Sequence, residues 1–511
     1  MFAALFRNIA ISAVAYAAVS GVALLLAPIL IAAFGLTGFG QIVIARLFIP
    51  NAALGIVDFG TSEIATQIVA RARRDDDWEE ASATLSVLAA ATLAMGISAG
   101  LALALAAPYI PAWMSVVAAQ RAGLTTVLMV TAMLMPLLFA SLLFEGILKG
   151  LEDFKAQRGC EVLAALSYGT AAIACVRMDL GIDAVCYALL LSLVIRLAFA
   201  GTVALKRLGR ERRRLRRWST AHRTFVVGWA RIMAVNKLLG ALQTQAAPPI
   251  IGFLFGPAAI GAVDALSRLP RFVKAVLGLL NSTVLPLAVR LEAGADHVQV
   301  KRLGGMGLVV IGMIVFAPLS AAMALSEPIV RLWLGRELAP HWPWQALLFV
   351  VPIANTLSGF GGAILLARAQ AAMAMNRIVL YQVALQLALG LALSPWLAEW
   401  GFVLSQVVAV LLTFFFQMRL IRREIGFGRD VVHQLVVGIV ATGAVATAFA
   451  LVASQICTVP VLLAALVACA LIGWAAVALL VPAPAQRKAL GQLAWRKLMA
   501  AIAVADRTLR P

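Results

Sequence analysis

The chain has 511 residues, of which 63% are hydrophobic and only 13% are charged, and its mean hydropathy is +0.97. Soluble globular chains are about 25% charged, so this composition excludes a soluble protein and indicates an all-α polytopic membrane protein. The formal net charge of +19 does not indicate nucleic-acid binding, because the basic residues lie between apolar runs, where they orient a membrane protein.

Apolar runs of bilayer-spanning length recur from the first residues almost to the C-terminus. We predict fourteen transmembrane helices. The predicted spans are 9–34, 41–69, 83–107, 124–148, 160–176, 182–204, 226–254, 258–289, 303–325, 344–366, 379–393, 401–418, 433–452 and 461–481. The first run is too long for the core of a signal peptide, so it is counted as a span.

The basic residues predict the orientation of these spans. With the N-terminus in the cytoplasm, the cytoplasmic connections hold most of the 42 Lys and Arg residues. The opposite face then has only Arg121, Arg177, Arg331 and Arg336. This asymmetry follows the positive-inside rule and predicts that both termini are cytoplasmic. The densest run, "KRLGRERRRLRRWSTAHR" at 206–223, is interpreted as an orienting loop that touches anionic lipid.

The two halves of the chain share a local pattern. The first span ends in "FGLTGFG", 34–40, and the seventh ends in "FGPAAIG", 255–261, so both read Phe-Gly-x4-Gly at an offset of 221 residues. Each pattern is followed by an intramembrane arginine and a proline, which are Arg46 with Pro50 and Arg268 with Pro270. We therefore predict a parallel six-plus-six repeat, with two six-helix lobes around a central cavity.

This repeat divides the chain into five parts. We predict a first lobe at 1–205, a basic cytoplasmic linker at 206–225 and a second lobe at 226–420. Two further helices lie at 421–482, and a basic cytoplasmic tail follows at 483–511.

Several stretches resemble the polysaccharide (O-antigen-type) flippase branch of the MOP (multidrug/oligosaccharidyl-lipid/polysaccharide) exporter superfamily. They are the turn at 34–40, "LGIVDFGTSEIATQIVAR" at 54–71, "EGILKGLEDFKAQR" at 145–158 and "IIGFLFGPAAIGAVDALSRL" at 250–269. The resemblance implies a protein of the bacterial inner membrane that moves an undecaprenyl-pyrophosphate-linked oligosaccharide by alternating access. It also implies cationic residues in the cavity.

A polar stripe is predicted on the eighth span. Asp264, Arg268, Arg271 and Lys274 lie within an arc of about 120° at 100° per residue. Arg268 is ten residues into the span, about 15 Å deep at 1.5 Å per residue. A charged side chain at that depth faces a water-filled cavity, pairs with an opposite charge, or extends toward the membrane surface (snorkels). The structural interpretation is a self-neutralising helix, in which Asp264 pairs with Arg268 at i,i+4 and Lys274 snorkels. That pairing accounts for one cation of three, which favours the functional interpretation, a solvated cationic stripe. Pro270 is a hinge candidate.

Other intramembrane charges extend this candidate site. The remaining cavity cations are Arg46, Arg196 and Lys237, with pairing to an acid of its own lobe as the alternative for Arg196. The acids Asp58, Glu63 and Glu145 either pair with Arg or Lys or bind a coupling ion, and Pro50 is the second hinge candidate. The excess of cations favours an anionic ligand, and Arg suits bidentate contacts to phosphate.

Three rivals remain open at this stage. A lipid II flippase shares the spans and the anionic carrier. A MATE-like small-solute antiporter would have twelve spans and an acidic first lobe. A membrane glycosyltransferase or polymerase would need a large outer catalytic loop, which the sequence lacks. We expect no enzyme activity, no catalytic residue, no metal site and no cofactor apart from a coupling ion, H⁺ or Na⁺. The expected partners are the lipid-linked anionic glycan, membrane lipids, and a polymerase or glycosyltransferases, with no nucleic acid.

Overall fold

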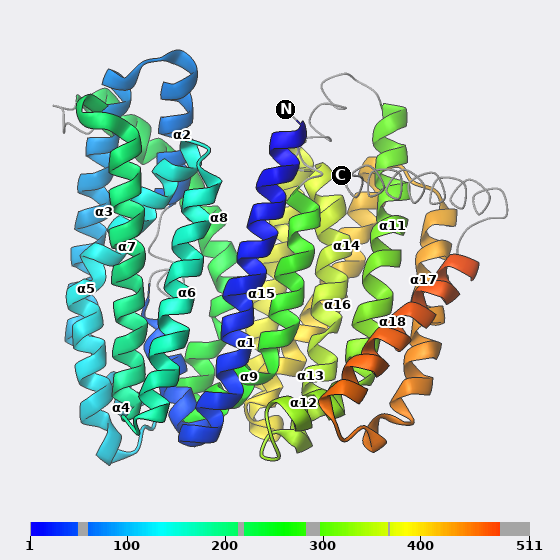
Figure 1. The fold of residues 1–511 in the computed structure, drawn as a ribbon. Coiled ribbons are helices and arrows are strands. Elements are labelled where there is room, and N and C mark those ends of the chain that lie inside the picture. Colours follow the sequence, from blue (N-terminus) through cyan, green and yellow to red (C-terminus); the bar gives the residue numbers. More distant parts are fainter. Residues whose placement is uncertain (1, 50–59, 213–218, 283–296, 366–367, 481–511) are drawn as a thin grey trace, which may run out of the picture. The chain divides into compact units, whose positions relative to one another are not determined.

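A computed structural model describes residues 2–49, 60–212, 219–282, 297–365 and 368–480, and these residues form helices and no strand (Figure 1). The helices of the first half are α1 (Phe2–Leu47), α2 (Thr61–Asp75), α3 (Trp78–Ala106), α4 (Ile110–Trp113), α5 (Ala118–Gly150), α6 (Phe154–Arg177) and α7 (Ile182–Arg212). Those of the second half are α8 (Thr220–Gln245), α9 (Ala247–Ser282), α11 (His297–Ala324), α12 (Ser326–Trp333), α13 (Trp342–Leu348), α14 (Val350–Leu365), α15 (Ala369–Leu397), α16 (Trp400–Ile425), α17 (Arg429–Ala450) and α18 (Val459–Leu480).

Twelve stretches of helix in the described part of the chain are long and apolar enough to cross a membrane. Two of them, in α1 and α9, contain an internal glycine with non-helical dihedral angles, so each joins two successive helices; a third, in α7, has such a glycine at its end, Gly209. Once α1 and α9 are divided there, every predicted span overlaps a described helix. Residues 50–59 of the second span and 283–289 of the eighth lie outside the described ranges. Several helices begin earlier than predicted, such as α6 at Phe154 rather than 160, because polar residues of the first turns fall outside an apolar run.

The glycines that interrupt α1 and α9 are the repeat-related pair Gly35 and Gly256. Gly35 has φ 66° and ψ 178°, and Gly256 has φ 82° and ψ −172°. This left-handed, extended combination is readily open only to glycine. The similar backbone conformations at the same position of both patterns confirm Phe-Gly-x4-Gly as a repeated structural feature.

The two repeated turns also contact each other. A Cβ atom on Gly40 would collide with the backbone carbonyl of Pro257, and one on Gly261 would lie 2.6 Å from the carbonyl oxygen of Leu36. Gly40 and Gly261 are 221 positions apart, as are Leu36 and Pro257. The contact is therefore reciprocal, and the last glycine of each turn allows the backbones to approach.

We expect Gly261→Val to lower the melting temperature of the purified protein. The new side chain meets backbone, which cannot rotate away, and such overpacking costs about 1–3 kcal/mol. Gly278→Ala, farther along α9, is the matched control because its Cβ would meet nothing within 4 Å. Thermal unfolding in detergent measures both variants, and equal melting temperatures would contradict the tight contact.

The chain forms two compact units, residues 1–279 with 377–409 and residues 280–376 with 410–511. In the first unit, α3, α5, α6 and α7 run side by side (Figure 1). Buried residues such as Ile64, Leu148 and Ala204 form one of its apolar clusters. In the second unit, α17 and α18 pack on α11, where a Cβ on Gly473 would lie 3.0 Å from Ala317. The division into two six-helix lobes with a linker and a tail stays a prediction, and residues 483–511 lie outside the described ranges.

Candidate functional site

Asp264 on α9 holds two of the predicted cations. Its Oδ2 lies 2.9 Å from Nε of Arg268, and its Oδ1 lies 2.6 Å from Nη2 of Arg271. The side chains of Asp264 and Arg268 are 10% and 11% exposed, whereas that of Arg271 is 48% exposed. The pair with Arg268 is confirmed. The expectation that Asp264 accounts for only one cation is wrong, because Arg271, two helical turns farther on, reaches the second oxygen.

Arg268 is fixed from α1 as well. Its Nη1 donates a hydrogen bond of 2.7 Å to the carbonyl of Ala23, and its guanidinium lies 4.7 Å from the ring centre of Phe39. These contacts hold the side chain between the two helices of α1. Lys274, the last cation of the stripe, has no ion-pair partner among the described residues and stays a candidate for snorkelling or ligand contact.

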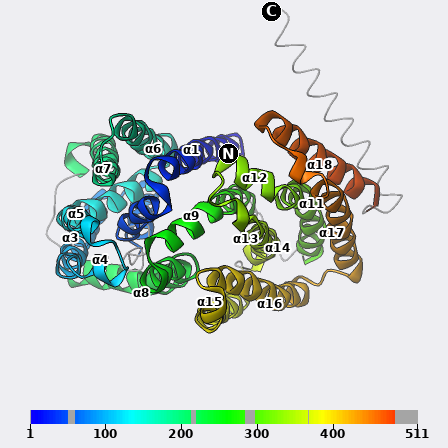
Figure 2. The same cartoon turned by 90° about the horizontal axis from the view of Figure 1, so that it is seen from below.

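Arg46 and Arg268 line the same cavity, which has a volume of about 380 Å³. Its walls come from α1, α6 and α7, which lie next to one another in Figure 2, and from Arg268 of α9. The polar lining residues are Tyr16, Arg46, Arg158, Glu161, Tyr168, Ser192, Arg196 and Arg268. The structure thus brings together three of the predicted cations, Arg46, Arg196 and Arg268. Arg46 makes no ion pair with a described residue.

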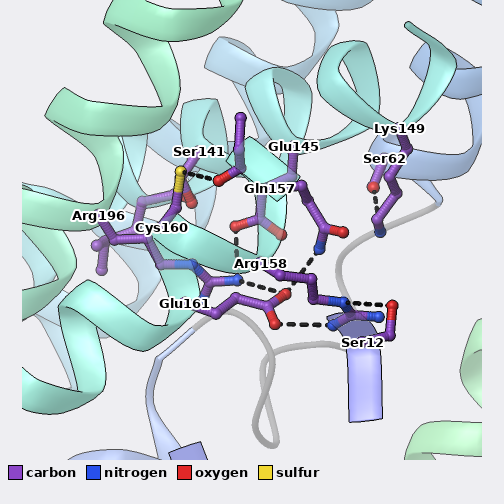
Figure 3. A network of polar contacts seen from close by, with 12 residues as sticks. Ser12, Ser62, Ser141, Glu145, Lys149, Gln157, Arg158, Cys160, Glu161 and Arg196 are labelled. Carbon is purple, nitrogen blue, oxygen red and sulfur yellow. Dashed lines mark hydrogen bonds and ion pairs between the residues drawn. The ribbon is translucent and has the colours of Figure 1, made fainter. Parts of the chain in front are cut away.

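A network of paired charges borders this cavity (Figure 3). Nη2 of Arg196 lies 2.7 Å from Oε1 of Glu145 on α5 and 3.8 Å from Oε1 of Glu161 on α6. Arg158 pairs with Glu161 at 2.7 Å and donates a hydrogen bond to the hydroxyl of Ser12 on α1. The pairing alternative for Arg196 is therefore the correct one, and Arg196 is a member of a neutral network rather than a free cavity cation.

Sequence reasoning missed five polar lining residues, which are Tyr16, Arg158, Glu161, Tyr168 and Ser192. The predicted fifth span begins at 160 and leaves Arg158 in the preceding connection, but α6 begins at Phe154 and places it inside the helix. A signal was present, since Arg158 and Glu161 are an i,i+3 pair at the edge of an apolar run.

Lys237 and Glu63 are not among the residues that line this cavity. Nζ of Lys237 on α8 is 2.9 Å from Oε1 of Glu63 on α2, so these two form an ion pair. Asp58 and Pro50 lie outside the described residues. The helix interruption in α9 is at Gly256, and no second one is found at Pro270. The hinge roles of Pro50 and Pro270 stay predictions.

Residues 5–292 match the family described as "Polysaccharide biosynthesis protein". The chain belongs to this family. The matched residues include both repeated turns, the network of paired charges around Arg196, and Asp264 with its two arginines. Curated proteins give no match.

Several solved transporters share the fold. An inward-facing multidrug resistance MATE transporter of the MOP superfamily superposes with a TM-score of 0.67 at 12% identity, over 81% of this chain and 94% of that one. A lipid II flippase, MurJ, in an inward closed conformation superposes with a TM-score of 0.66 at 10% identity, over 92% of this chain and 96% of that one. A MOP superfamily transporter from Pyrococcus furiosus, reported with a binding pocket of reversed polarity, has a TM-score of 0.59 at 14% identity. The match covers 82% of this chain and 96% of that one. This chain is therefore a multi-pass membrane protein with the MOP-superfamily fold.

Proposed function

We propose that this protein is a flippase that moves an oligosaccharide linked to a lipid diphosphate across the bacterial inner membrane by alternating access. The observation that carries the proposal is the charge balance on α1 and α9. Arg46, Arg268 and Arg271 stand against the single carboxylate of Asp264. The group therefore has an excess of two positive charges, before Lys274 is counted.

This excess matches the two negative charges of a diphosphate diester. The guanidinium of Arg268 is bound to Asp264 and Ala23, which fixes its direction before a ligand arrives. Prepositioned guanidinium groups lower the entropic cost of binding and suit phosphate oxygens. A cationic drug would need the opposite balance. The family match supports a polysaccharide unit over lipid II, which shares the same diphosphate.

The coupling ion is a further part of the proposal. Two of the candidate acids are engaged, Glu63 with Lys237 and Glu145 with Arg196. Binding of H⁺ or Na⁺ at either acid would compete with its ion pair, so coupling through them requires the pair to open during transport.

Reconstituted liposomes test the proposal. The probe is the lipid-linked glycan that accumulates in cells lacking this protein, loaded into the outer leaflet. Periodate that cannot cross the membrane then oxidises only outward-facing sugars. We expect the protein to move glycan into the protected leaflet, whereas protein-free liposomes leave it exposed. No gain in protection would contradict the proposal, and faster movement of lipid II in the same assay would favour the lipid II alternative.

A further inference from the structure

The cavity between α1, α6 and α7 has two ends along α1: Arg268 donates a hydrogen bond to Ala23 at one, and Arg158 donates one to Ser12, eleven residues away, at the other. Eleven residues of α-helix span about 16 Å. The two ends differ in electrostatic character. At one end, Arg46 and Arg268 belong to the group with excess positive charge. At the other, Arg158 and Arg196 are matched by Glu161 and Glu145. An anion gains most at the first end, because the second has no net charge to offer it.

The neutral end is suited to hydroxyl groups. Sugar hydroxyls both donate and accept hydrogen bonds, so a recognition site needs donors and acceptors close together. Arg158 and Glu161 pair with each other at 2.7 Å and so place a donor group next to an acceptor group. The hydroxyl of Ser192 on α7 donates to the carbonyl oxygen of Leu189 and adds an acceptor oxygen. The side chains of Arg158, Glu161 and Arg196 remain between 17% and 25% exposed.

Two tyrosines complete the lining. Tyr16 comes from α1 and Tyr168 from α6. Aromatic rings stack on the apolar C–H faces of sugars, and a phenol adds a hydrogen-bonding group at the edge of the ring. The volume of about 380 Å³ is at the small end of the 300–1,000 Å³ that is usual for ligand pockets. It suits a mono- or disaccharide rather than a whole repeat unit.

Resting on the proposed function, we infer that this cavity is a glycan-recognition subsite. It receives the sugar next to the diphosphate, while Arg46 and Arg268 contact the diphosphate itself. Tyr16 and Tyr168 stack on the sugar ring, and Arg158, Glu161 and Ser192 bind its hydroxyls. The sugar next to the lipid is then a determinant of specificity, and the remainder of the glycan lies outside the cavity.

Binding measurements on the purified full-length protein test this inference. The two probes are undecaprenyl diphosphate without sugar and the lipid-linked glycan from cells that lack the protein. We expect the wild type to bind the glycan form about tenfold more tightly. Tyr168→Ala should remove most of that preference and leave the affinity for undecaprenyl diphosphate within about twofold. Tyr168→Phe should keep most of the preference, because it keeps the ring.

Tyr381→Ala is the matched control, since Tyr381 on α15 is 69% exposed and does not line the cavity. Retained affinity for undecaprenyl diphosphate also shows that each variant is folded. The inference is overturned if the wild type binds the two probes equally, or if Tyr168→Ala weakens both to the same extent. Binding of neither probe by the wild type would instead overturn the proposed function.

Discussion

An Arg268→Ala/Arg271→Ala variant is expected to lose glycan export while remaining in the membrane. Hydrogen bonds to charged groups are worth about 1.5–3 kcal/mol each, so the loss of two guanidinium groups should weaken diphosphate binding at least about a hundredfold. Export is measured as surface polysaccharide in cells without the chromosomal copy, and insertion as the amount of protein in the membrane fraction. Near-normal export by the double variant would exclude a role for these cations.

One further variant separates binding from folding. Removal of both arginines leaves the buried carboxylate of Asp264 without its ion pairs, which is itself destabilising. Adding Asp264→Asn removes that charge and should restore stability, but not export. Restored export in the triple variant would mean that the arginines serve only to neutralise Asp264. Arg74→Ala is the control for loss of a basic residue, because Arg74 is 75% exposed and bonds only its neighbour Asp75 in the described structure.

The features that follow from spacing along one helix could be predicted from the sequence. The apolar runs gave the membrane-spanning helices, and the i,i+4 spacing gave the pair of Asp264 with Arg268. The Phe-Gly-x4-Gly repeat located Gly35 and Gly256, where the structure has matching left-handed glycines. In each case the sequence interval alone determines the geometry.

The features that depend on contacts between helices could not be predicted. Arg196 is on α7, Glu145 on α5 and Glu161 on α6, and their pairing depends on how these helices are rotated and tilted. Sequence spacing does not encode those angles, so Arg196 was grouped with the cavity cations. The same limit hid the cavity itself, whose lining comes from four helices.

The pairing of Arg196 leads to the second prediction, which concerns stability. Breaking a buried ion pair by removing one partner costs about 3–5 kcal/mol, because a charge stays buried without compensation. Glu145 is 5% exposed, so both Glu145→Leu and Arg196→Met are expected to destabilise the protein strongly. The effect of Arg196→Met should be larger. Loss of the Arg196 guanidinium leaves Glu145 without an ion pair in the described structure. Loss of the Glu145 carboxylate leaves Arg196 with a second partner, Glu161 at 3.8 Å.

The double variant Glu145→Leu/Arg196→Met decides whether the two side chains act as a pair. Replacing both members of a buried pair by apolar residues is often close to neutral, so the double variant should be more stable than Arg196→Met alone. Thermal unfolding in detergent measures the three variants. Arg207→Ala is the control, because it breaks the ion pair of Arg207 with Asp153, in which the Arg207 side chain is 63% exposed. Exposed ion pairs contribute about 0–1 kcal/mol to stability. Strictly additive losses in the double variant would show that Arg196 and Glu145 stabilise the bundle independently. The network would then be a set of separate contacts rather than a coupled pair.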